Sequence, residues 1–428
     1  MLDQRTPVER AVLVSAPLRT LPERTVEEHV DELRRLTDTA GGLVVGELTQ
    51  RIAAPTASTY IGSGKVRELR ELVESVEADL VVFDEELKPD QAQNLERGLG
   101  VRIMDRSELI LDIFASRART REAKLQVELA QLQYLLPRLS RMWTHLSRIR
   151  GGIGLRGPGE TQLETDRRLI GRRISKLRAN LEEVSEARAT QRKRRTDSFR
   201  VALVGYTNAG KSSILRALSG DELFVEDRLF ATLDSATRQV ELGAGYTALV
   251  TDTVGFIRKL PHHLVASFRS TLEEVREADL ILHVVDSSHP DREEQQSVVD
   301  EVLAEMEVSD VPRLLVYNKV DRLTHSEEEA LRGRTRALED TPSVFVSALE
   351  EDGLQSLLDA LRVRVRARFP RVRMELPVAD GEMLAAVHRE GEVLDSQTEG
   401  EIIRLTARLP EALLGRIRQQ AGVVVEEA

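Results

Sequence analysis

The pattern of apolar and polar positions changes period several times along the chain. In the first 110 residues, short apolar runs alternate with stretches in which apolar residues recur at helical spacing. The runs lie at 11–14, 43–45, 80–83 and 101–104, and the helical stretches lie near 26–37, 65–75 and 89–97. Because strands that alternate with helices are typical of βαβ units, this part is predicted to be a small parallel α/β domain.

Residues 120–195 follow a helical repeat instead. Apolar side chains recur at spacings of four and three residues in two separate stretches. They are Leu125, Leu129, Leu132, Leu136 and Leu139, then Ile170, Ile174, Leu177, Leu181 and Val184. Two helices, each on the order of 28 residues or about 42 Å long, should therefore pack antiparallel along these stripes. Pro137 lies inside the first helix and is expected to kink it.

A glycine-rich segment, 151–159, joins the two predicted helices. It holds five glycines in nine residues, with Arg148, Arg150 and Arg156 beside it and Trp143 shortly before it. Such a segment is either a flexible connector or a loop whose backbone can approach an irregular surface closely. The basic stretch 191–195 that follows the second helix is either a linker or a phosphate contact.

From residue 199 onward, apolar runs again predict buried strands. The run 201–204 precedes Gly205-Tyr206-Thr207-Asn208-Ala209-Gly210-Lys211-Ser212, and apolar residues at helical spacing follow it. This is the G-x-x-x-x-G-K-[ST] phosphate loop in its proper strand–loop–helix context. Its backbone N–H groups and the N-terminus of the helix should bind phosphate. Lys211 should reach the β- and γ-phosphates, and Ser212 should bind Mg²⁺.

Three further motifs follow, each at the end of an apolar run. They are Asp252-Thr253-Val254-Gly255, then Asn318-Lys319-Val320-Asp321, then Ser347-Ala348-Leu349. In the first, Asp252 should hold Mg²⁺ through water and the Gly255 N–H should meet the γ-phosphate. A buried Asp321 would pair with guanine N1–H and the 2-amino group and would be left unpaired against ATP. The backbone N–H groups of 347–349 can meet guanine O6, so the motifs together predict a GTPase that binds GTP and Mg²⁺.

The predicted fold class is α/β, with a P-loop GTPase domain, a parallel α/β domain before it, an antiparallel helical hairpin and a small α+β C-terminal domain. The expected boundaries are 1–115, 116–198, 199–368 and 369–428. The last domain should hold a strand at 371–376, a helix near 380–389, a strand pair around 393 and 402–405, and a helix from Pro410. It carries no catalytic constellation. Gly62-Ser63-Gly64-Lys65 resembles a phosphate loop, but Val66 replaces the metal-binding hydroxyl, so a helix-entry turn is favoured over a nucleic-acid contact.

Composition and charge narrow the function. The chain has 428 residues and no cysteine, which excludes disulfides, thiolate metal sites and cysteine nucleophiles. It has no apolar run long enough to span a membrane and no signal-peptide pattern, so a cytoplasmic protein is expected, with a peripheral membrane fraction at most. Residues 115–200 carry 21 Lys or Arg against 9 Asp or Glu, on a chain whose net charge is −11. Charge alone leaves open a polyanionic partner or a solvated helix face.

The motifs resemble those of the HflX family of translational GTPases, over essentially the whole chain. The matching stretches are 151–168, 205–212, 230–234, 252–257 and 62–65, of which the glycine-rich tip is the most diagnostic. Two departures are Ser213, in place of a commoner threonine, and Ser235-Ala236-Thr237, in place of Pro-Thr-Thr; neither removes a ligand.

The resemblance implies a monomer that binds the 50S subunit and its 23S rRNA, near the peptidyl-transferase region, and splits stalled or idle 70S ribosomes under stress. It assigns the first switch loop to 230–234, with Thr232 as an Mg²⁺ ligand beside Ser212, and Lys211, Thr232 and Gly255 as the catalytic groups. The nucleotide site it implies is Gly205, Tyr206, Thr207, Asn208, Ala209, Gly210, Lys211, Ser212, Ser213, Phe230, Ala231, Thr232, Leu233, Asp234, Asp252, Thr253, Val254, Gly255, Asn318, Lys319, Val320, Asp321, Ser347, Ala348 and Leu349. No DNA and no integral membrane association are expected.

Several alternatives remain open. The protein is a splitting factor, or an assembly or idling factor that binds the large subunit without splitting ribosomes. A tRNA-modifying GTPase is disfavoured because those enzymes carry a reactive cysteine near the C-terminus. Phe256 stands where many GTPases place a water-orienting Gln, so the ribosome or another residue must order the water. Asn208 either recruits K⁺ near the phosphates or caps its own loop.

Overall fold

The computed structural model describes residues 8–139, 159–192, 198–220, 229–243, 245–260, 269–308, 310–338, 341–419 and 424–427. By their internal contacts these residues form two compact units. The first comprises Met1–Ala187, Glu226–Asp234 and Arg258–Ser270, and the second comprises Arg188–Val225, Ser235–Ile257 and Thr271–Ala428. Two short segments that the predicted boundaries assign to the GTPase domain, 229–234 and 258–260, therefore belong by contact to the N-terminal unit. In the part of the chain that the structure describes, no helix has the length and apolarity needed to cross a bilayer.

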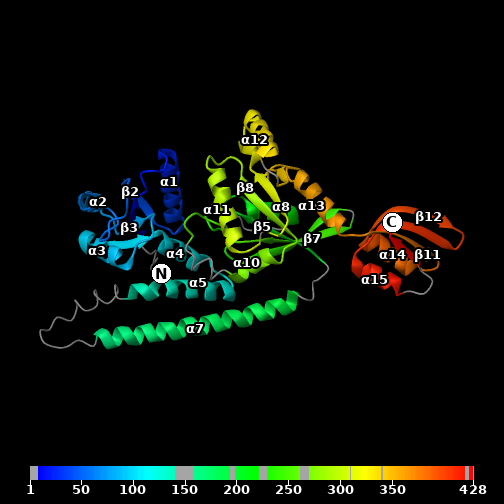
Figure 1. The fold of residues 1–428 in the computed structure, drawn as a ribbon, viewed down its shortest axis with the longest axis horizontal. Coiled ribbons are helices and arrows are strands. Elements are labelled where there is room, and N and C mark those ends of the chain that lie inside the picture. Colours follow the sequence, from blue (N-terminus) through cyan, green and yellow to red (C-terminus); the bar gives the residue numbers. More distant parts are fainter. Residues whose placement is uncertain are drawn as a thin grey trace, which may run out of the picture. The chain divides into compact units, whose positions relative to one another are not determined.

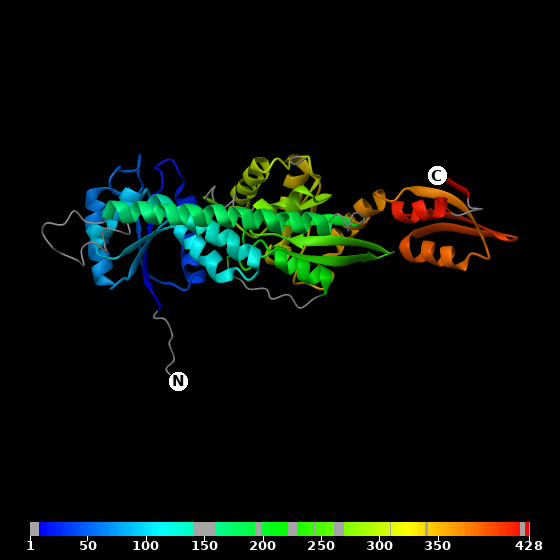
Figure 2. The ribbon, with the colours of Figure 1, turned by 90° about the horizontal axis from the view of Figure 1, so that it is seen from below.

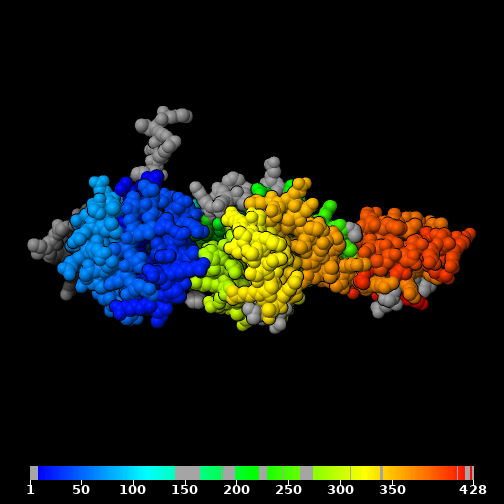
Figure 3. Space-filling view, turned by 90° about the horizontal axis from the view of Figure 1, so that it is seen from above, coloured from blue at the N-terminus to red at the C-terminus, as the bar shows by residue number. Residues whose placement is uncertain are grey.

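The N-terminal part of the first unit is a four-stranded parallel sheet with the order β2-β1-β3-β4, which confirms the predicted α/β domain (Figure 1). Its strands and helices alternate along the chain. They are β1 (Arg10–Ser15), α1 (Glu23–Thr39), β2 (Leu43–Thr49), α2 (Ser63–Ser75), β3 (Leu80–Phe83), α3 (Pro89–Leu99), β4 (Arg102–Asp105) and α4 (Arg106–Arg117). In the space-filling view of Figure 3, this part forms the blue surface.

The order of the strands creates a switch point between β1 and β3. The chain leaves β1 toward β2 on one side of the sheet and returns to β3 on the other. In open α/β sheets, ligands bind in the crevice outside the carboxyl ends of the strands at this point. Asp84 and Glu85 follow β3 directly there, and the Ala16 N–H after β1 donates to Oε2 of Glu85 at 3.0 Å.

The helical hairpin is confirmed along its predicted seam. Its helices are α5 (Arg121–Leu135) and α7 (Gly159–Arg192), which lie side by side in Figures 1 and 2. Their contact is formed by Leu129, Ile174 and Leu177, with Leu125, Leu132, Leu136, Ile170 and Leu181 against them. The helix α7 has 34 residues and is longer than predicted. At Pro137 the chain changes from α-helix to a 3₁₀ turn, Leu136–Arg138, because the proline removes one backbone donor. The glycine-rich tip lies outside the described residues, except for Gly159.

The second unit contains a six-stranded sheet with the order β10-β9-β8-β5-β7-β6. All neighbours are parallel except β6 and β7. The strands are β5 (Phe199–Gly205), β6 (Ala236–Gly243), β7 (Tyr246–Asp252), β8 (Leu280–Asp286), β9 (Arg313–Asn318) and β10 (Ser343–Phe345). The helices are α8 (Lys211–Ser219), α10 (Arg269–Arg276), α11 (Arg292–Glu305), α12 (His325–Leu338) and α13 (Gln355–Ala367). Each predicted nucleotide motif lies at the carboxyl end of a strand of this sheet.

The C-terminal residues form an antiparallel sheet with the order β12-β13-β11-β14. Its elements are β11 (Arg371–Pro377), α14 (Gly381–Glu390), β12 (Glu392–Glu399), β13 (Ile402–Arg408), α15 (Glu411–Arg418) and β14 (Val424–Glu427). The predicted strands and helices are confirmed here, and β14 is additional. The Tyr246 hydroxyl donates to Glu392 at 2.7 Å and its ring stacks on Phe369, which ties this sheet to β7.

Candidate nucleotide-binding site

The predicted phosphate loop turns between β5 and α8, as expected. Two glycines are needed for steric reasons. A Cβ on Gly205 would come 2.3 Å from the Val284 carbonyl oxygen, and one on Gly210 would come 2.1 Å from Nδ2 of Asn318. Gly210 also has a φ of +97° and precedes the first residue of α8. The loop therefore presents the N-terminus of α8 to the position where a phosphate group would lie.

Lys211 is buried beneath this loop. Its Nζ donates to the carbonyl oxygens of Gly205 at 3.0 Å and Tyr206 at 2.9 Å. Burial lowers the pKa of Lys211 to about 8, with Asp252 opposing the shift and Lys319 adding to it. An ammonium held in this way lacks a full counter-charge, and the phosphates of a nucleotide supply one.

Ser212, a predicted ligand of Mg²⁺, lies beside Asp252, which is predicted to hold the ion through water. The Ser212 hydroxyl donates to Oδ2 of Asp252 at 2.5 Å, and Asp252 is buried at the end of β7. The next residue, Thr253, donates to the Leu203 carbonyl at 2.7 Å and fixes β7 against β5. Among the described residues no cluster of three or more acidic or histidine side chains forms a metal cage. This donor set fits Mg²⁺, which uses one or two protein oxygens together with substrate phosphates and water.

The D-x-x-G turn lies directly against the phosphate loop. A Cβ on Gly255 would come 2.7 Å from Cα of Thr207 and 3.1 Å from Nζ of Lys211. Phe256 pairs with the loop through its backbone: its N–H donates to the Gly205 carbonyl at 3.1 Å, and its carbonyl accepts from the Thr207 N–H at 2.7 Å. Glycine is required at 255 because any side chain would collide with the phosphate loop.

The second and third motifs meet at the other end of the loop. Asn318 donates through Nδ2 to the Ala209 carbonyl at 2.9 Å and accepts the Ala348 N–H at 3.3 Å. Lys319 donates to the Asn208 carbonyl at 2.9 Å. These contacts join the two motifs predicted to recognise guanine directly to the phosphate loop.

Asp321 differs from its prediction in one respect, because it is exposed in the structure rather than buried. Its Oδ1 accepts the Ser347 hydroxyl at 2.6 Å, and Ser347 itself is buried. Leu349 is 70% exposed, so only its backbone N–H is suited to the predicted contact. A bound guanine base must therefore be what shields Asp321 from water.

Sequence reasoning missed two residues of this region. Asp286 at the end of β8 pairs with Nζ of Lys319 at 2.6 Å, and the Ser287 hydroxyl donates to the Asn318 carbonyl at 2.7 Å. The signal was available, because Asp286 ends an apolar run in the same way as Asp252 does. Both residues hold the Asn318–Lys319 turn, in which Lys319 has a φ of +65°.

The segment 230–234, predicted to be the first switch loop, belongs to the N-terminal unit. The Phe230 ring packs edge-on against Phe114 at 4.7 Å between centroids. Asp234 accepts the backbone N–H groups of Arg119 at 3.0 Å and Thr120 at 3.3 Å, where α5 begins. Thr232 is half-buried in the same loop, and its ligation of Mg²⁺ stays a prediction. Trp143, Arg148, Arg150 and Arg156 lie outside the described residues.

The sequence of the chain matches known protein families. Three family models match consecutive parts of the chain. The model described as "GTP-binding GTPase N-terminal" matches residues 27–115, "GTP-binding GTPase Middle Region" matches 117–195, and "50S ribosome-binding GTPase" matches 200–319.

Curated relatives match nearly the whole chain. The GTPase HflX of Magnetococcus marinus is 46% identical over 432 residues, which cover 100% of this chain and 99% of that protein. The chain belongs to the HflX family. The HflX GTPases of Alkalihalophilus pseudofirmus and Escherichia coli are 47% and 40% identical, over 90% and 100% of this chain and 89% and 99% of theirs. A GTP-binding protein from Sulfolobus solfataricus solved with GDP has 25% identity and a TM-score of 0.44, over 84% of this chain and 99% of that one.

Membership of the HflX family makes the site described above that of a GTP hydrolase. The P-loop, the D-x-x-G turn and the Asn318–Asp321 motif all lie within or just beyond the matched GTPase region. The predictions of family, fold class and GTPase activity are confirmed. The assignments of individual site residues remain predictions that the geometry supports.

Proposed function

We propose that this HflX-family GTPase binds the 50S subunit through 23S rRNA and dissociates stalled or idle 70S ribosomes in the cytoplasm under stress. The observation that carries the proposal is the hairpin. Its helix α7 has 34 residues, about 51 Å at the usual helical rise, and one side packs on α5. Between 167 and 178 its other positions carry six exposed cations, namely Arg167, Arg168, Arg172, Arg173, Lys176 and Arg178, whereas exposed glutamates such as Glu164, Glu182 and Glu183 lie toward its two ends.

The composition of the exposed side of α7 indicates an RNA-binding surface in preference to one that contacts only solvent. Five of its six cations are arginines, which bind phosphate in a bidentate manner. They occur on a chain whose net charge is −11, so the basic charge is concentrated and not general. Neutralising several phosphates would release counterions and make the docking strongly salt-dependent.

In this account the nucleotide site works as a switch. The P-loop N–H groups and Lys211 bind the phosphates, and Ser212 with Asp252 would hold Mg²⁺, which neutralises charge on the β- and γ-phosphates. The Gly255 N–H and Thr232 contact the γ-phosphate side and order both switch loops, and hydrolysis releases them. Asp321 and the N–H groups of 347–349 select guanine.

Two details of catalysis belong to the proposal. Phe256 is 2% exposed, its backbone is engaged with the P-loop, and its ring cannot orient water. The ribosome is therefore the proposed source of the water-ordering group. Asn208, which has a φ of +62°, is proposed to bring K⁺ to the phosphates; equal hydrolysis rates in K⁺ and Na⁺ at matched ionic strength would remove this idea.

The alternative is a factor of large-subunit assembly or idling whose GTP state only sets its affinity. Sedimentation of 70S ribosomes with the protein and a non-hydrolysable GTP analogue separates the two. Splitting predicts conversion of the 70S peak into 30S and 50S peaks, with the protein, as a monomer, on the 50S. Protein that sediments with intact 70S or with added 50S, without a loss of 70S, supports the alternative. The matched control is Arg404→Gln, an exposed arginine of the C-terminal sheet, which should split as the wild type does.

A further inference from the structure

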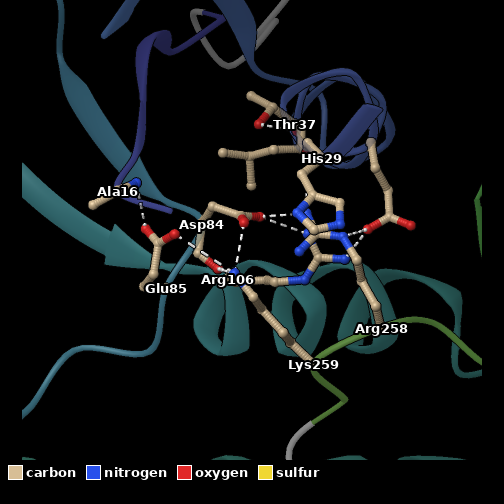
Figure 4. A network of polar contacts seen from close by, with 10 residues as sticks. Ala16, His29, Thr37, Asp84, Glu85, Arg106, Arg258 and Lys259 are labelled. Atoms are coloured by element: carbon tan, nitrogen blue, oxygen red, sulfur yellow. Dashed lines mark hydrogen bonds and ion pairs between the residues drawn. The ribbon is translucent and has the colours of Figure 1, made fainter. Parts of the chain in front are cut away.

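A cluster of charged side chains, centred on a buried carboxylate, lies at the switch point of the N-terminal sheet (Figure 4). Its centre is Asp84, which is 1% exposed and follows β3. Nη1 of Arg106 lies 2.8 Å from its Oδ1, and Arg106 also pairs with Glu32 of α1. Arg106 is the first residue of α4, in the same α/β domain as Asp84. The ion pair between Arg106 and Asp84 is therefore internal to that domain.

Two further cations of the cluster come from a distant part of the sequence. Nη2 of Arg258 lies 2.9 Å from Oδ1 of Asp84, and Nζ of Lys259 lies 2.8 Å from its Oδ2. Arg258 also donates to the His29 carbonyl at 3.1 Å and pairs through Nε with Glu32 at 2.9 Å. Lys259 lies 3.6 Å from Glu85. The crevice where α/β sheets usually bind a ligand thus holds two side chains of the same chain.

The charges balance only when this segment is in place. Asp84, Glu85 and Glu32 contribute three carboxylates, and Arg106, Arg258 and Lys259 contribute three cations. Burial alone would raise the pKa of Asp84, but the three cations, led by Arg258, hold it well below its usual range. Without Arg258 and Lys259, two buried carboxylates would lack cations, and uncompensated buried charge is strongly unfavourable. These ion pairs therefore stabilise the position in which Arg258 and Lys259 contact Asp84.

Arg258 and Lys259 lie close in sequence to a residue of the proposed nucleotide switch. Arg258 follows Gly255 by three residues, and Gly255 is the glycine that meets the γ-phosphate in the proposed switch. Lys259 has a φ of +53°, a conformation that residues other than glycine keep only where their surroundings fix it. Three residues span at most about 11 Å, and Phe256 between them is hydrogen-bonded to Gly205 and Thr207 of the P-loop, so Arg258 is tethered closely to both Gly255 and the P-loop.

We propose that Arg258 and Lys259 are positioning residues that fasten the second switch segment to Asp84, so that the nucleotide state is transmitted to the N-terminal unit. That unit includes α5, which begins the hairpin. The inference requires only that the protein binds GTP. It can therefore be wrong while the proposal of ribosome splitting is right, and it can be right while that proposal is wrong.

Hydrogen exchange of the purified full-length protein tests this without ribosomes. The probes are GDP and a non-hydrolysable GTP analogue, and the observed peptides cover 26–36 and 80–86. In the wild type we expect exchange in these peptides to differ about fivefold between the two nucleotides, within the usual range of coupling between sites. In Arg258→Met/Lys259→Met the difference should vanish while exchange around Lys211 still responds to each nucleotide.

Two variants make the result specific. Arg102→Met removes an ion pair between an exposed arginine and Glu108 in the same unit and should keep the wild-type difference. Lys259→Arg keeps the charge and should also keep it. If the double variant does not fold, Lys259→Met alone serves, because its side chain is 42% exposed, and it should reduce the difference by half or more. Equal exchange with both nucleotides in the wild type overturns the inference, as does an unchanged difference in the double variant or, where that variant does not fold, in Lys259→Met.

Discussion

The Ser347 hydroxyl donates to Oδ1 of Asp321 at 2.6 Å and orients the carboxylate that is predicted to pair with guanine. Asp321→Asn replaces one acceptor by a donor, which clashes with guanine N1–H and suits a xanthine oxygen. We expect the affinity for GTP to fall on the order of a hundredfold and preference to move toward xanthosine triphosphate. Calorimetric titration of both proteins with both nucleotides measures this. Unchanged GTP affinity of the variant would remove Asp321 from the site.

Gly210→Ala should abolish nucleotide binding for a local steric reason. The new Cβ would lie 2.1 Å from Nδ2 of Asn318, which must leave its bond to the Ala209 carbonyl. Gly220→Ala is the matched control, since Gly220 also has a positive φ, +71°, but no atom lies within 4 Å of its added Cβ. Gly210→Ala should lose more than about 1 kcal/mol of stability in denaturant unfolding because it also displaces Asn318, whereas Gly220→Ala should lose about 1 kcal/mol from its positive φ alone. Only the first should lose affinity for GDP, so equal affinities would contradict the assignment.

GTP affinity should depend on pH through Lys211. Its pKa of about 8 lies below the ordinary value, so the free protein loses this positive charge as the pH rises past 8. The phosphates favour the charged form, and binding therefore takes up a proton above that pH. Affinity should fall about tenfold between pH 7 and pH 9, a range in which the GTP phosphates stay largely ionised. The residual affinity of Lys211→Met should be flat over the same range. A wild type that is equally flat contradicts the role of Lys211.

Intrinsic GTP hydrolysis should be slow and should rise when 50S subunits are added. Phe256 is buried, and its backbone atoms are bonded to Gly205 and Thr207, so it offers nothing to an attacking water. Single-turnover rates with and without 50S subunits measure the effect, and 30S subunits provide the control. A fast rate for the free protein would show that another residue of the chain orders the water.

Much of the fold could be predicted because its signals are local. The strands of both parallel sheets read as apolar runs, and the phosphate loop is fixed by the spacing of Gly205, Gly210 and Lys211. The helix α4 was missed because Leu109, Ile110, Leu111, Ile113 and Phe114 are all buried, so its apolar positions run almost continuously and leave only a narrow polar side at Asp112 and Ser116.

The parts that escaped prediction depend on contacts between distant residues. Arg258 and Asp84 are 174 positions apart, and Asp234 and Thr120 are 114 apart. The spacing of charged residues along the sequence does not indicate their partners. No sequence pattern predicts which carboxylate a given arginine will pair with. The same limit explains why Asp321 was expected to be buried: its exposure depends on how the loops around it fold and not on its own motif.

The glycine-rich tip is the working end of the arm in this account, and its replacement tests the central claim most directly. The variant carries a short Gly-Ser turn in place of residues 151–159. Light scattering of 70S ribosomes, mixed with protein and a non-hydrolysable GTP analogue, reports the loss of intact particles in real time. We predict that the wild type lowers the scattering and that the variant does not, although it binds the analogue equally well and docks in a salt-sensitive manner through α7. If the variant separates 70S ribosomes at the wild-type rate, or the wild type separates none, the account is wrong.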